Sequence, residues 1–466
     1  SPGGVVVSFA STTLSNGAGV NWRLACNAEE DGGFANAITT SYVHNSPQNG
    51  GDYKSPFFYH VLLDIKQTDC TVEYTPTLGG EKNATGSMTR RIRIPPLASA
   101  FGGDPQQSFK LALVGDLGQT INSVQTMQHV AAEQDEIAAL LIMGDLSYAD
   151  NDDPRWDSWS RMFQDHLDHI PMFSLPGNHE IETDSADGVS FRPYAHRFQN
   201  MPNCKNGCGG FDNDGWKANM WFSFDIGSAH IIHVSSYHNW SVGSPQYTWL
   251  EGDLASVDRT KTPWLIVNLH APWYNSNIAH QGEIYSYAVK ETWQPLLCEH
   301  GVNIMFAGHV HSYERMFPTC DNSTISPQTG ITYVNIGDGG NREGLYNNWL
   351  PGEEGRAGPV WSAFREGSYG HGMLTIENAT HAIWEWHRNQ DGVAVKRDTA
   401  IIRNYRYSAK DGEGKESRSE GDPARSFSGY LGVLTGALVV YSIAMTVLFL
   451  RNRKKKEATA YENITN

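Results

Sequence analysis

The chain has 466 residues, of which 39% are hydrophobic, 18% charged and 11% aromatic, a globular composition that excludes a disordered, collagenous or coiled-coil protein. Acidic residues outnumber basic residues by 51 to 35, which gives a formal net charge of −16. This balance argues against a protein that binds nucleic acid through a broad basic surface. The length suggests two or three domains.

The first region, residues 1–98, is rich in Ser, Thr, Gly and Asn. Short β-prone runs begin at Val5, Phe57, Cys70 and Arg90, and they predict a small all-β sandwich. A linker rich in Gly and Pro, at about residues 95–107, separates this domain from the next.

In residues 108–404, apolar strand-like runs alternate with amphipathic stretches, which is the pattern of an α/β domain. Eight runs read as strands, and they end at Val114, Met143, Leu175, Asp225, Ser236, Leu269, Ala307 and Ile336. Residues 121–136 carry apolar positions at helical spacing, so a β-α-β unit opens the domain. Five runs lead directly into polar turns. Because functional groups collect at the carboxyl ends of strands in open sheets, we expect a site at these turns.

The C-terminal part predicts a membrane anchor. Residues 429–450 contain no charged residue and are long enough for one transmembrane helix; the alternative is a buried core helix. Five basic residues within 451–456 mark the tail, 451–466, as cytoplasmic. Residues 405–428 read as a juxtamembrane stalk. The prediction is a single-pass type I protein of the plasma membrane or of a secretory or vacuolar membrane. This topology requires a signal peptide, so we expect a processed or missing segment before Ser1.

The cysteines and glycosylation sequons fit an extracytoplasmic location. Six cysteines predict three disulfides; short separations favour Cys204–Cys208 and Cys298–Cys320, which leaves Cys26 for Cys70. The connectivity stays open among about fifteen arrangements, and a zinc site is disfavoured because no paired CxxC spacing occurs. Sequons on the outer side, which predict a glycoprotein, lie at Asn83, Asn239, Asn322 and Asn378.

The five polar turns hold the residues that carry chemistry. They read GDLG at 115–118, GDLSY at 144–148, GNHE at 177–180, NLH at 268–270 and GHVH at 308–311. Taken singly, each has an ordinary alternative as a turn, a loop or a surface His pair. Together they supply an oxygen and nitrogen ligand set for two adjacent metal ions that share one carboxylate. Glycine before several of the ligands would let the chain turn sharply there. The predicted ligands are Asp116, Asp145, Tyr148, Asn178, His270, His309 and His311.

This series of motifs resembles the calcineurin-like metallophosphoesterase superfamily, and the variant with Tyr148 resembles the purple acid phosphatases, in particular the plant-type, high-molecular-weight branch. Further segments that resemble this branch begin at His270, Gly308, Ile336, Ser362 and Trp384. The resemblance covers most of residues 109–400. It implies an N-terminal fibronectin-III-like sandwich, here without its first strand, and a metallophosphoesterase domain in which a β-sandwich is flanked by helices as four α/β/β/α layers.

The resemblance also implies which metal each residue binds. A ferric ion would be bound by Asp116, Tyr148 and His311, and a divalent ion by Asn178, His270 and His309, with Asp145 as the bridge. A phenolate suits the trivalent ion, and histidines suit Zn, Mn or Fe(II). The resemblance implies a purple colour, and ligand types leave the divalent metal open.

Two cations on a phosphate ester would neutralise its oxygens and hold a metal-bound hydroxide as the nucleophile. The leaving group needs a proton, for which His179 and His280 are the candidates. The alternative for His280 is an exposed loop histidine. Ala279 stands where the plant-type motif has a second histidine, which puts the substrate range in question. Glu314, Arg315 and Asp338 are expected to support the ligand loops.

The predicted function is a membrane-anchored acid phosphatase for small phosphate monoesters. The alternative is a phosphodiesterase or nucleotide pyrophosphatase on the same metal pair. A third hypothesis is a surface recognition protein with an inactive site, which the complete ligand set disfavours. The partners expected are the substrate and the lipid bilayer, with no nucleic acid. The natural substrate and the oligomeric state stay open, with a homodimer among the options.

Overall fold

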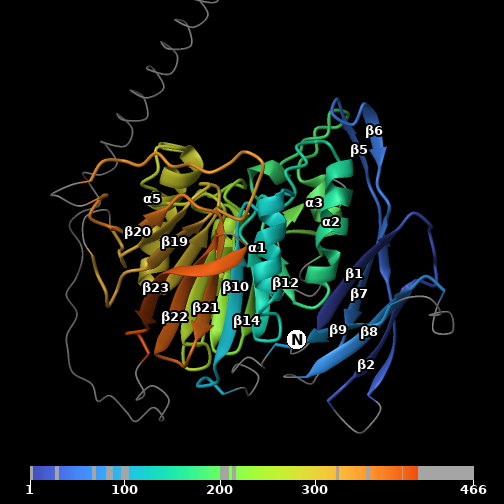
Figure 1. Cartoon of the computed structure of the whole chain (residues 1–466), viewed down its shortest axis with the longest axis horizontal. Helices are drawn as coiled ribbons and strands as arrows, with labels where there is room; N and C mark the ends of the chain where they lie inside the picture. Colours follow the sequence, from blue (N-terminus) through green and yellow to red (C-terminus); the bar gives the residue numbers. More distant parts are fainter. Residues whose placement is uncertain are drawn as a thin grey trace, which may run out of the picture. The chain divides into compact units, whose positions relative to one another are not determined.

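The computed structural model describes residues 4–26, 31–65, 70–79, 88–95, 104–199, 209–211, 217–321, 325–352, 357–390 and 392–407 (Figure 1). All of them fall in one compact unit, residues 1–412. The predicted transmembrane segment, residues 429–450, and the tail, 451–466, lie outside the described residues, as does the stalk beyond residue 407. Within the described ranges, every helix is too short or too polar to cross a membrane.

The N-terminal region contains two antiparallel sheets. A three-stranded sheet has the order β1-β7-β4, a four-stranded sheet has the order β3-β2-β8-β9, and β5 and β6 form a separate hairpin. The strands are β1 Val5–Ser11, β2 Gly19–Leu24, β3 Gly32–Asn36, β4 Ile38–Thr40, β5 Val43–Ser46, β6 Gly51–Lys54, β7 Phe57–Leu63, β8 Thr71–Thr77 and β9 Arg90–Arg93. Val7 and Val61 of one sheet share a buried core with Val20 and Val72 of the other. The predicted β-sandwich is therefore present.

The second region is built on two larger sheets. One has the order β12-β11-β10-β21-β22-β23 and the other has the order β13-β14-β15-β16-β17-β19-β18-β20. Their strands are β10 Phe109–Val114, β11 Ile137–Ile142, β12 Met172–Ser174, β13 Gly209–Phe211, β14 Lys217–Ile226, β15 Ala229–His233, β16 Trp264–Asn268, β17 Ile304–Ala307, β18 Tyr313–Met316, β19 Thr332–Ile336, β20 Ser362–Glu366, β21 Gly370–Ile376, β22 His381–Gln390 and β23 Val393–Arg403. All eight runs predicted as strands contain one.

Alternating residues of the central strands enter two different cores. Leu111 and Leu113 of β10 belong to a core formed by residues of both sheets. Ala112 and Val114 of the same strand belong to a second core that includes the helices. Because both faces are buried, these strands read as continuous apolar runs rather than as alternating ones.

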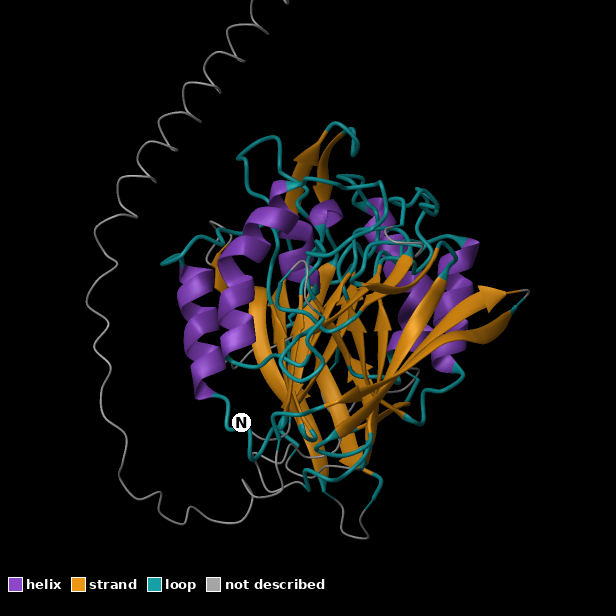
Figure 2. Ribbon diagram, turned by 90° about the vertical axis from the view of Figure 1, so that its left-hand side faces the viewer, coloured by secondary structure: helices purple, strands orange, loops and turns teal. Residues whose placement is uncertain are grey.

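Helices lie on both sides of the paired sheets (Figure 2). They are α1 Ile121–Ala131, α2 Pro154–Leu167, α3 Arg192–Arg197, α4 Pro245–Ser256 and α5 Ile284–Glu299. Thr120 caps α1 by accepting hydrogen bonds from the backbone N–H groups of residues 122 and 123. The arrangement agrees with the α/β/β/α layers expected.

The structure corrects the predicted end of the first helix, confirms the two disulfides that lie in the described residues, and leaves the domain boundary untested. The helix predicted over residues 121–136 ends at Ala131, because residues 132–136 form turns in which Glu133 lies 3.0 Å from the amine of Lys110. Disulfides join Cys26 to Cys70 and Cys298 to Cys320, as favoured. Residues 204 and 208 lie outside the described ranges. The division into domains at residues 98–108 stays a prediction.

The sequons have mixed positions. Asn239 is exposed and Asn378 is half-buried, while residues 83 and 322 are outside the part of the chain that the structure describes. Glycosylation stays a prediction.

Candidate metal centre

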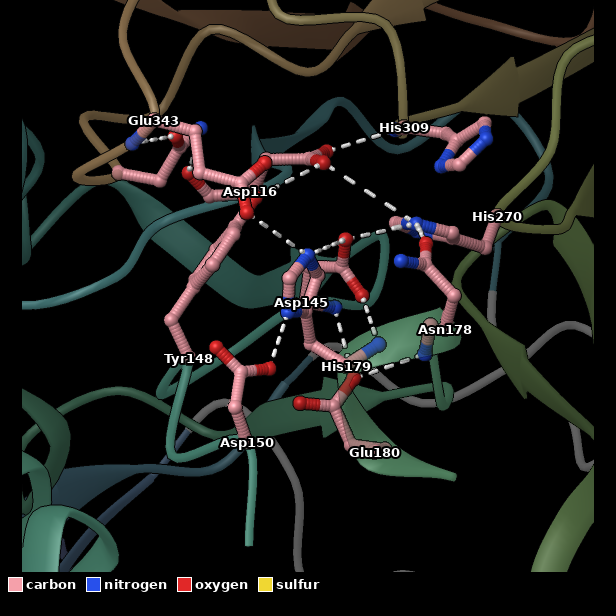
Figure 3. A network of polar contacts seen from close by, with 12 residues as sticks. Asp116, Asp145, Tyr148, Asp150, Asn178, His179, Glu180, His270, His309 and Glu343 are labelled. Carbon is pink, nitrogen blue, oxygen red and sulfur yellow. Dashed lines mark hydrogen bonds and ion pairs between the residues drawn. The ribbon is translucent and has the colours of Figure 1, made fainter. Parts of the chain in front are cut away.

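The predicted ligands follow the carboxyl ends of strands in both sheets. Asp116 follows β10, Asp145 and Tyr148 follow β11, and Asn178 follows β12. His270 follows β16 in the other sheet, and His309 and His311 follow β17. Parallel pairing of β10 with β11 and of β16 with β17 brings these ends to one edge of each sheet. The structure therefore gathers all seven residues: Asn178 is half-buried and the other six are buried (Figure 3 labels all of them but His311).

The backbone is strained at this edge. Asp116, Asp145, Tyr148 and His309 have left-handed φ angles of 54°, 53°, 52° and 68°. Such angles are uncommon for residues other than glycine, and each costs on the order of 1–3 kcal/mol unless the surroundings hold it. Strain at four of seven predicted ligands marks a functional site.

The glycines of the motifs have a different role from the one predicted. Of the four that precede Asp116, Asp145, Asn178 and His309, only Gly144 has a positive φ, of 85°. A Cβ atom on Gly177 would lie 2.0 Å from Oδ1 of Asp145. Close approach of side chains to the backbone, more than a sharp turn, thus requires these glycines.

One half of the centre contains Tyr148. Its hydroxyl lies 3.3 Å from Oδ1 of Asp116 and 3.1 Å from Nε2 of His311. The other ring nitrogen of His311, Nδ1, donates to the carbonyl oxygen of Gly344 at 3.1 Å. In the neutral ring, Nε2 then presents a lone pair toward the two oxygens.

The other half contains His270. Its Nδ1 donates to the carbonyl oxygen of Met143 at 2.6 Å. Nε2 lies 3.0 Å from Oδ2 of Asp145 and 3.1 Å from Oδ1 of Asn178. In the neutral ring, three lone pairs converge with no proton between them, an arrangement that a cation satisfies. Asp145, His270 and His309 also have ligand atoms within 4.8 Å of one another. The residues present therefore fit metal ions.

The electrostatics of the cluster agree with this fit. Burial raises the pKa of the Tyr148 phenol well above its usual value, and the charges of Asp116 and Asp145 raise it further. A phenolate here therefore requires a cation. Burial lowers the pKa of His270, but Asp145 and Asp116 outweigh burial and raise it to about 9. The cluster thus carries a negative potential that attracts positive charge.

The two predicted proton donors lie beside the ligands. His179 is hydrogen-bonded through Nδ1 to Oδ1 of Asp150, and its Nε2 lies 3.9 Å from Oδ2 of Asp145 (Figure 3). Burial opposes protonation, but Asp150 and Asp145 raise the pKa of His179 to about 10. The His280 side chain is only 24% exposed, and its Nδ1 lies 2.7 Å from Oε1 of Glu283. Its ring centroid is 4.0 Å from that of His309, so it is more than an exposed loop histidine.

Residues outside the predicted set also shape the centre. The buried carboxylate of Glu180 accepts hydrogen bonds from the backbone N–H groups of Asp145, Leu146 and Gly177 at 2.8, 2.9 and 2.8 Å. It therefore ties the turn after β11 to the turn after β12. Glu180 is the last residue of the GNHE motif, and this position could have indicated its role.

Three other residues contact the centre although the sequence offers little or no indication of it. Glu283 contacts Nε2 of His309 at 2.8 Å, which leaves Nδ1 of that ring for a metal. The hydroxyl of Tyr237 donates to Oδ1 of Asn178 at 3.2 Å. Glu343 lies 3.6 Å from Nε2 of His179. These residues come from loops outside the five motifs.

The three residues expected to support the ligand loops are buried or half-buried, each with its own partner. Glu314 accepts hydrogen bonds from the backbone N–H and the hydroxyl of Ser276. Arg315 donates to Asp398 from Nε at 2.7 Å. Asp338 accepts from the indole of Trp386 at 2.8 Å.

Known families and proteins resemble the chain over most of its length. The family model described as calcineurin-like phosphoesterase matches residues 109–313, and the one described as iron/zinc purple acid phosphatase-like protein C matches residues 330–396. The chain is 42% identical over 294 residues to the probable purple acid phosphatase 20 of Arabidopsis thaliana, a match that spans 63% of this chain and 65% of that relative, just under two thirds of its length.

Two further relatives are matched over more of their length. The chain is 37% identical over 388 residues to the phosphoenolpyruvate phosphatase of Allium cepa, covering 79% of this chain and 73% of the relative. It is 33% identical over 418 residues to the Fe(3+)-Zn(2+) purple acid phosphatase 12 of Arabidopsis thaliana, covering 86% and 81%. A purple acid phosphatase from yellow lupin seeds shares the fold, with a TM-score of 0.71 at 19% identity over 90% of this chain and 77% of that one.

Proposed function

The chain belongs to the purple acid phosphatases, and we propose that it hydrolyses phosphate monoesters in acid at the metal centre described above. It is a phosphatase and therefore a hydrolase, and its cofactors are iron and a divalent metal, as the sequence predicts. The observation that carries the proposal is the convergence of lone pairs from Asp145, Asn178 and His270, with Tyr148 and His311 beside them.

We assign the ligands to two positions. Asp116, Tyr148 and His311 would hold the ferric ion, because their contacts of 3.1 and 3.3 Å group the phenol with one carboxylate and one imidazole. Asn178, His270 and His309 would hold the divalent ion, and Asp145 would bridge. When bound, the two ions neutralise phosphate oxygens and acidify the water that acts as nucleophile.

The protein's own residues complete the reaction. Nδ1 of His179 is hydrogen-bonded to Asp150, so Nε2 is the atom that can give a proton to the leaving alcohol. A guanidinium N–H of Arg342 donates to the other oxygen of Asp150 and so fixes that carboxylate. His280, held by Glu283, is the second candidate donor.

We also propose that residues 429–450 anchor the protein in a plasma, secretory or vacuolar membrane, with residues 405–428 as stalk and 451–466 as cytoplasmic tail. This proposal is supported by the uncharged run and its basic flank. The two disulfides support an extracytoplasmic position for the rest of the chain. Expression of a tagged chain followed by carbonate extraction tests the anchor: recovery in the soluble fraction would refute it.

The catalytic proposal is tested by initial rates on an aryl phosphate monoester and the matching diester, from acidic to neutral pH. We expect monoester turnover that peaks in acid and disappears in Asp145→Asn. Faster hydrolysis of the diester would instead support the phosphodiesterase alternative. If neither ester reacts although both metals are bound, the site is inactive and the proposal fails.

A further inference from the structure

A hairpin of the N-terminal region contacts the turn that leads from β11 to α2. The carboxylate of Asp153, at the start of α2, is completely buried. Its Oδ1 accepts from the hydroxyl of Tyr42 at 2.6 Å, and its Oδ2 accepts from Nδ1 of His44 at 2.5 Å and from Nδ2 of Asn49 at 2.9 Å. His44 lies on β5 and Asn49 in the β5–β6 loop. A buried charge of the second region thus depends on donors from the first.

The turn itself is strained and is held from the same hairpin. Tyr148, Asp150 and Asn151 have φ angles of 52°, 53° and 68°, so three of four consecutive residues are left-handed without being glycine. The hydroxyl of Ser46, on β5, donates to the carbonyl oxygen of Asn151 at 2.6 Å. The N–H of Asn151 donates to the buried Glu182 at 3.0 Å. Both peptide groups of Asn151 are therefore fixed, and a strained conformation persists only when its surroundings hold it.

The strained turn carries two residues of the catalytic site. Tyr148 is a metal ligand in the proposed function, and Asp150 binds Nδ1 of His179 through one oxygen and Arg342 through the other. A shift of this turn would therefore move the residue that sets the direction of His179.

We propose that the β5–β6 hairpin is a positioning element for phosphate ester hydrolysis: it holds the turn at residues 148–153 so that Asp150 aims His179 at the leaving group. The inference rests on the proposed function, in which His179 is the proton donor. No residue of the hairpin is among the ligands and proton donors of the proposed function. Its effect is carried by Ser46, which donates to the carbonyl oxygen of Asn151, and by Asn49, whose Oδ1 accepts from the backbone N–H of Asp153 at 2.9 Å.

The same contact between the two regions offers a matched control. At the other end of α2, about 20 Å away for a helix of this length, Tyr74 donates to the carbonyl oxygen of Asp168, and Arg90 pairs with the carboxylate of Asp168. Arg90→Ala therefore removes a contact between the same two regions without touching the turn at residues 148–153.

The test compares Ser46→Ala and Asn49→Ala with Arg90→Ala in the protein loaded with both metals. Loss of proton donation slows esters of basic alcohols most, and general acid catalysis contributes roughly 10²–10⁴-fold. We expect kcat on an alkyl phosphate to fall about tenfold in the hairpin variants, with a much smaller fall on 4-nitrophenyl phosphate, whose leaving group needs little protonation. Arg90→Ala should leave both rates unchanged.

Two further measurements separate positioning from a general loss of structure. Amide hydrogen exchange at residues 149–152 should be faster in the hairpin variants than in the wild type and in Arg90→Ala. In an Asp150→Asn background, Ser46→Ala should cause no further loss of activity, because both changes act through the same residue.

Wild-type exchange together with a wild-type ratio of the two substrate rates in both hairpin variants would overturn the inference. So would a loss in Ser46→Ala that is fully additive with Asp150→Asn. If the wild type hydrolyses neither ester, the proposed function fails, and unchanged exchange in Ser46→Ala would then separately refute the contact's role in holding the turn.

Discussion

Glu180 links two turns that carry ligands, and its replacement by glutamine tests how much the centre depends on that link. Oε2 accepts from the N–H groups of Asp145 and Gly177, and Oε1 accepts from that of Leu146. Glutamine can place its one carbonyl oxygen at only one of these positions. If it satisfies Asp145 and Gly177, its NH₂ group faces the N–H of Leu146, donor against donor.

The expected loss of stability follows from the number of backbone N–H groups that lose their acceptor. One buried backbone N–H loses its acceptor, which costs about 1–3 kcal/mol. The pKa of Glu180 is raised by burial and by Asp145 to about 7, so unfolding is compared at pH 8, where the carboxylate is ionised, and initial rates are compared from acidic to neutral pH. A misplaced bridging Asp145 should also slow turnover by about tenfold or more, because reactions of this kind are sensitive to small shifts.

The assay is urea unfolding and initial rates on an aryl phosphate for the wild type and Glu180→Gln. Glu251→Gln, an exposed change on α4, is the matched control and should stay within about 0.5 kcal/mol of the wild type. A Glu180→Gln protein with wild-type stability and turnover would refute the reasoning that this carboxylate holds the two turns together.

Three other predictions concern colour, pH and metal removal. Tyr148→Phe should abolish the visible absorption of the loaded protein, since the phenol is the expected ligand of iron; a retained purple colour would contradict that role. His230 is half-buried, and burial alone would lower its pKa, but Asp225 and Asp253 raise that pKa to about 9. The pKa of His230 in the folded protein exceeds its unfolded value of about 6.5, so its pairing with the two aspartates adds up to about 3 kcal/mol to the free energy of unfolding. This contribution is complete below pH ~6.5 and disappears as the pH rises to about 9. The urea midpoint of His230→Asn should therefore fall further below the wild type at pH 6 than at pH 9, and equal differences would contradict the pairing. Chelation of both ions should lower the wild-type midpoint, because ions bound only by the native state stabilise it, and an unchanged midpoint would show that they contribute no stability.

The strands, and the gathering of the candidate ligands at their carboxyl ends, could be predicted because their signals are local. Strands such as β10 and β16, which are buried on both faces, leave uninterrupted apolar runs in the sequence. Each ligand follows its strand within a few residues, so the motif and the structure coincide. The end of α1 was harder to predict, because residues 132–136 keep helix-forming side chains while Lys110 pairs with Glu133 outside the helix.

The rest of the site depends on contacts between distant residues. Glu283 and Glu343 reach the centre from separate loops, and neither residue lies in one of the five ligand motifs. The hairpin contact is more remote still, since His44 and Asp153 are 109 positions apart. A buried Asp looks the same in the sequence whether its donors lie in its own domain or in another.

The central claim is that one carboxylate, Asp145, joins two metal ions. It is tested most directly by elemental analysis of the purified protein and of Asp145→Asn. The account predicts about two ions per chain in the wild type, one of them iron, and loss of both in the variant because its bridge is weakened. A wild type that holds one ion or none after reconstitution, or an Asp145→Asn protein that retains both, would contradict it.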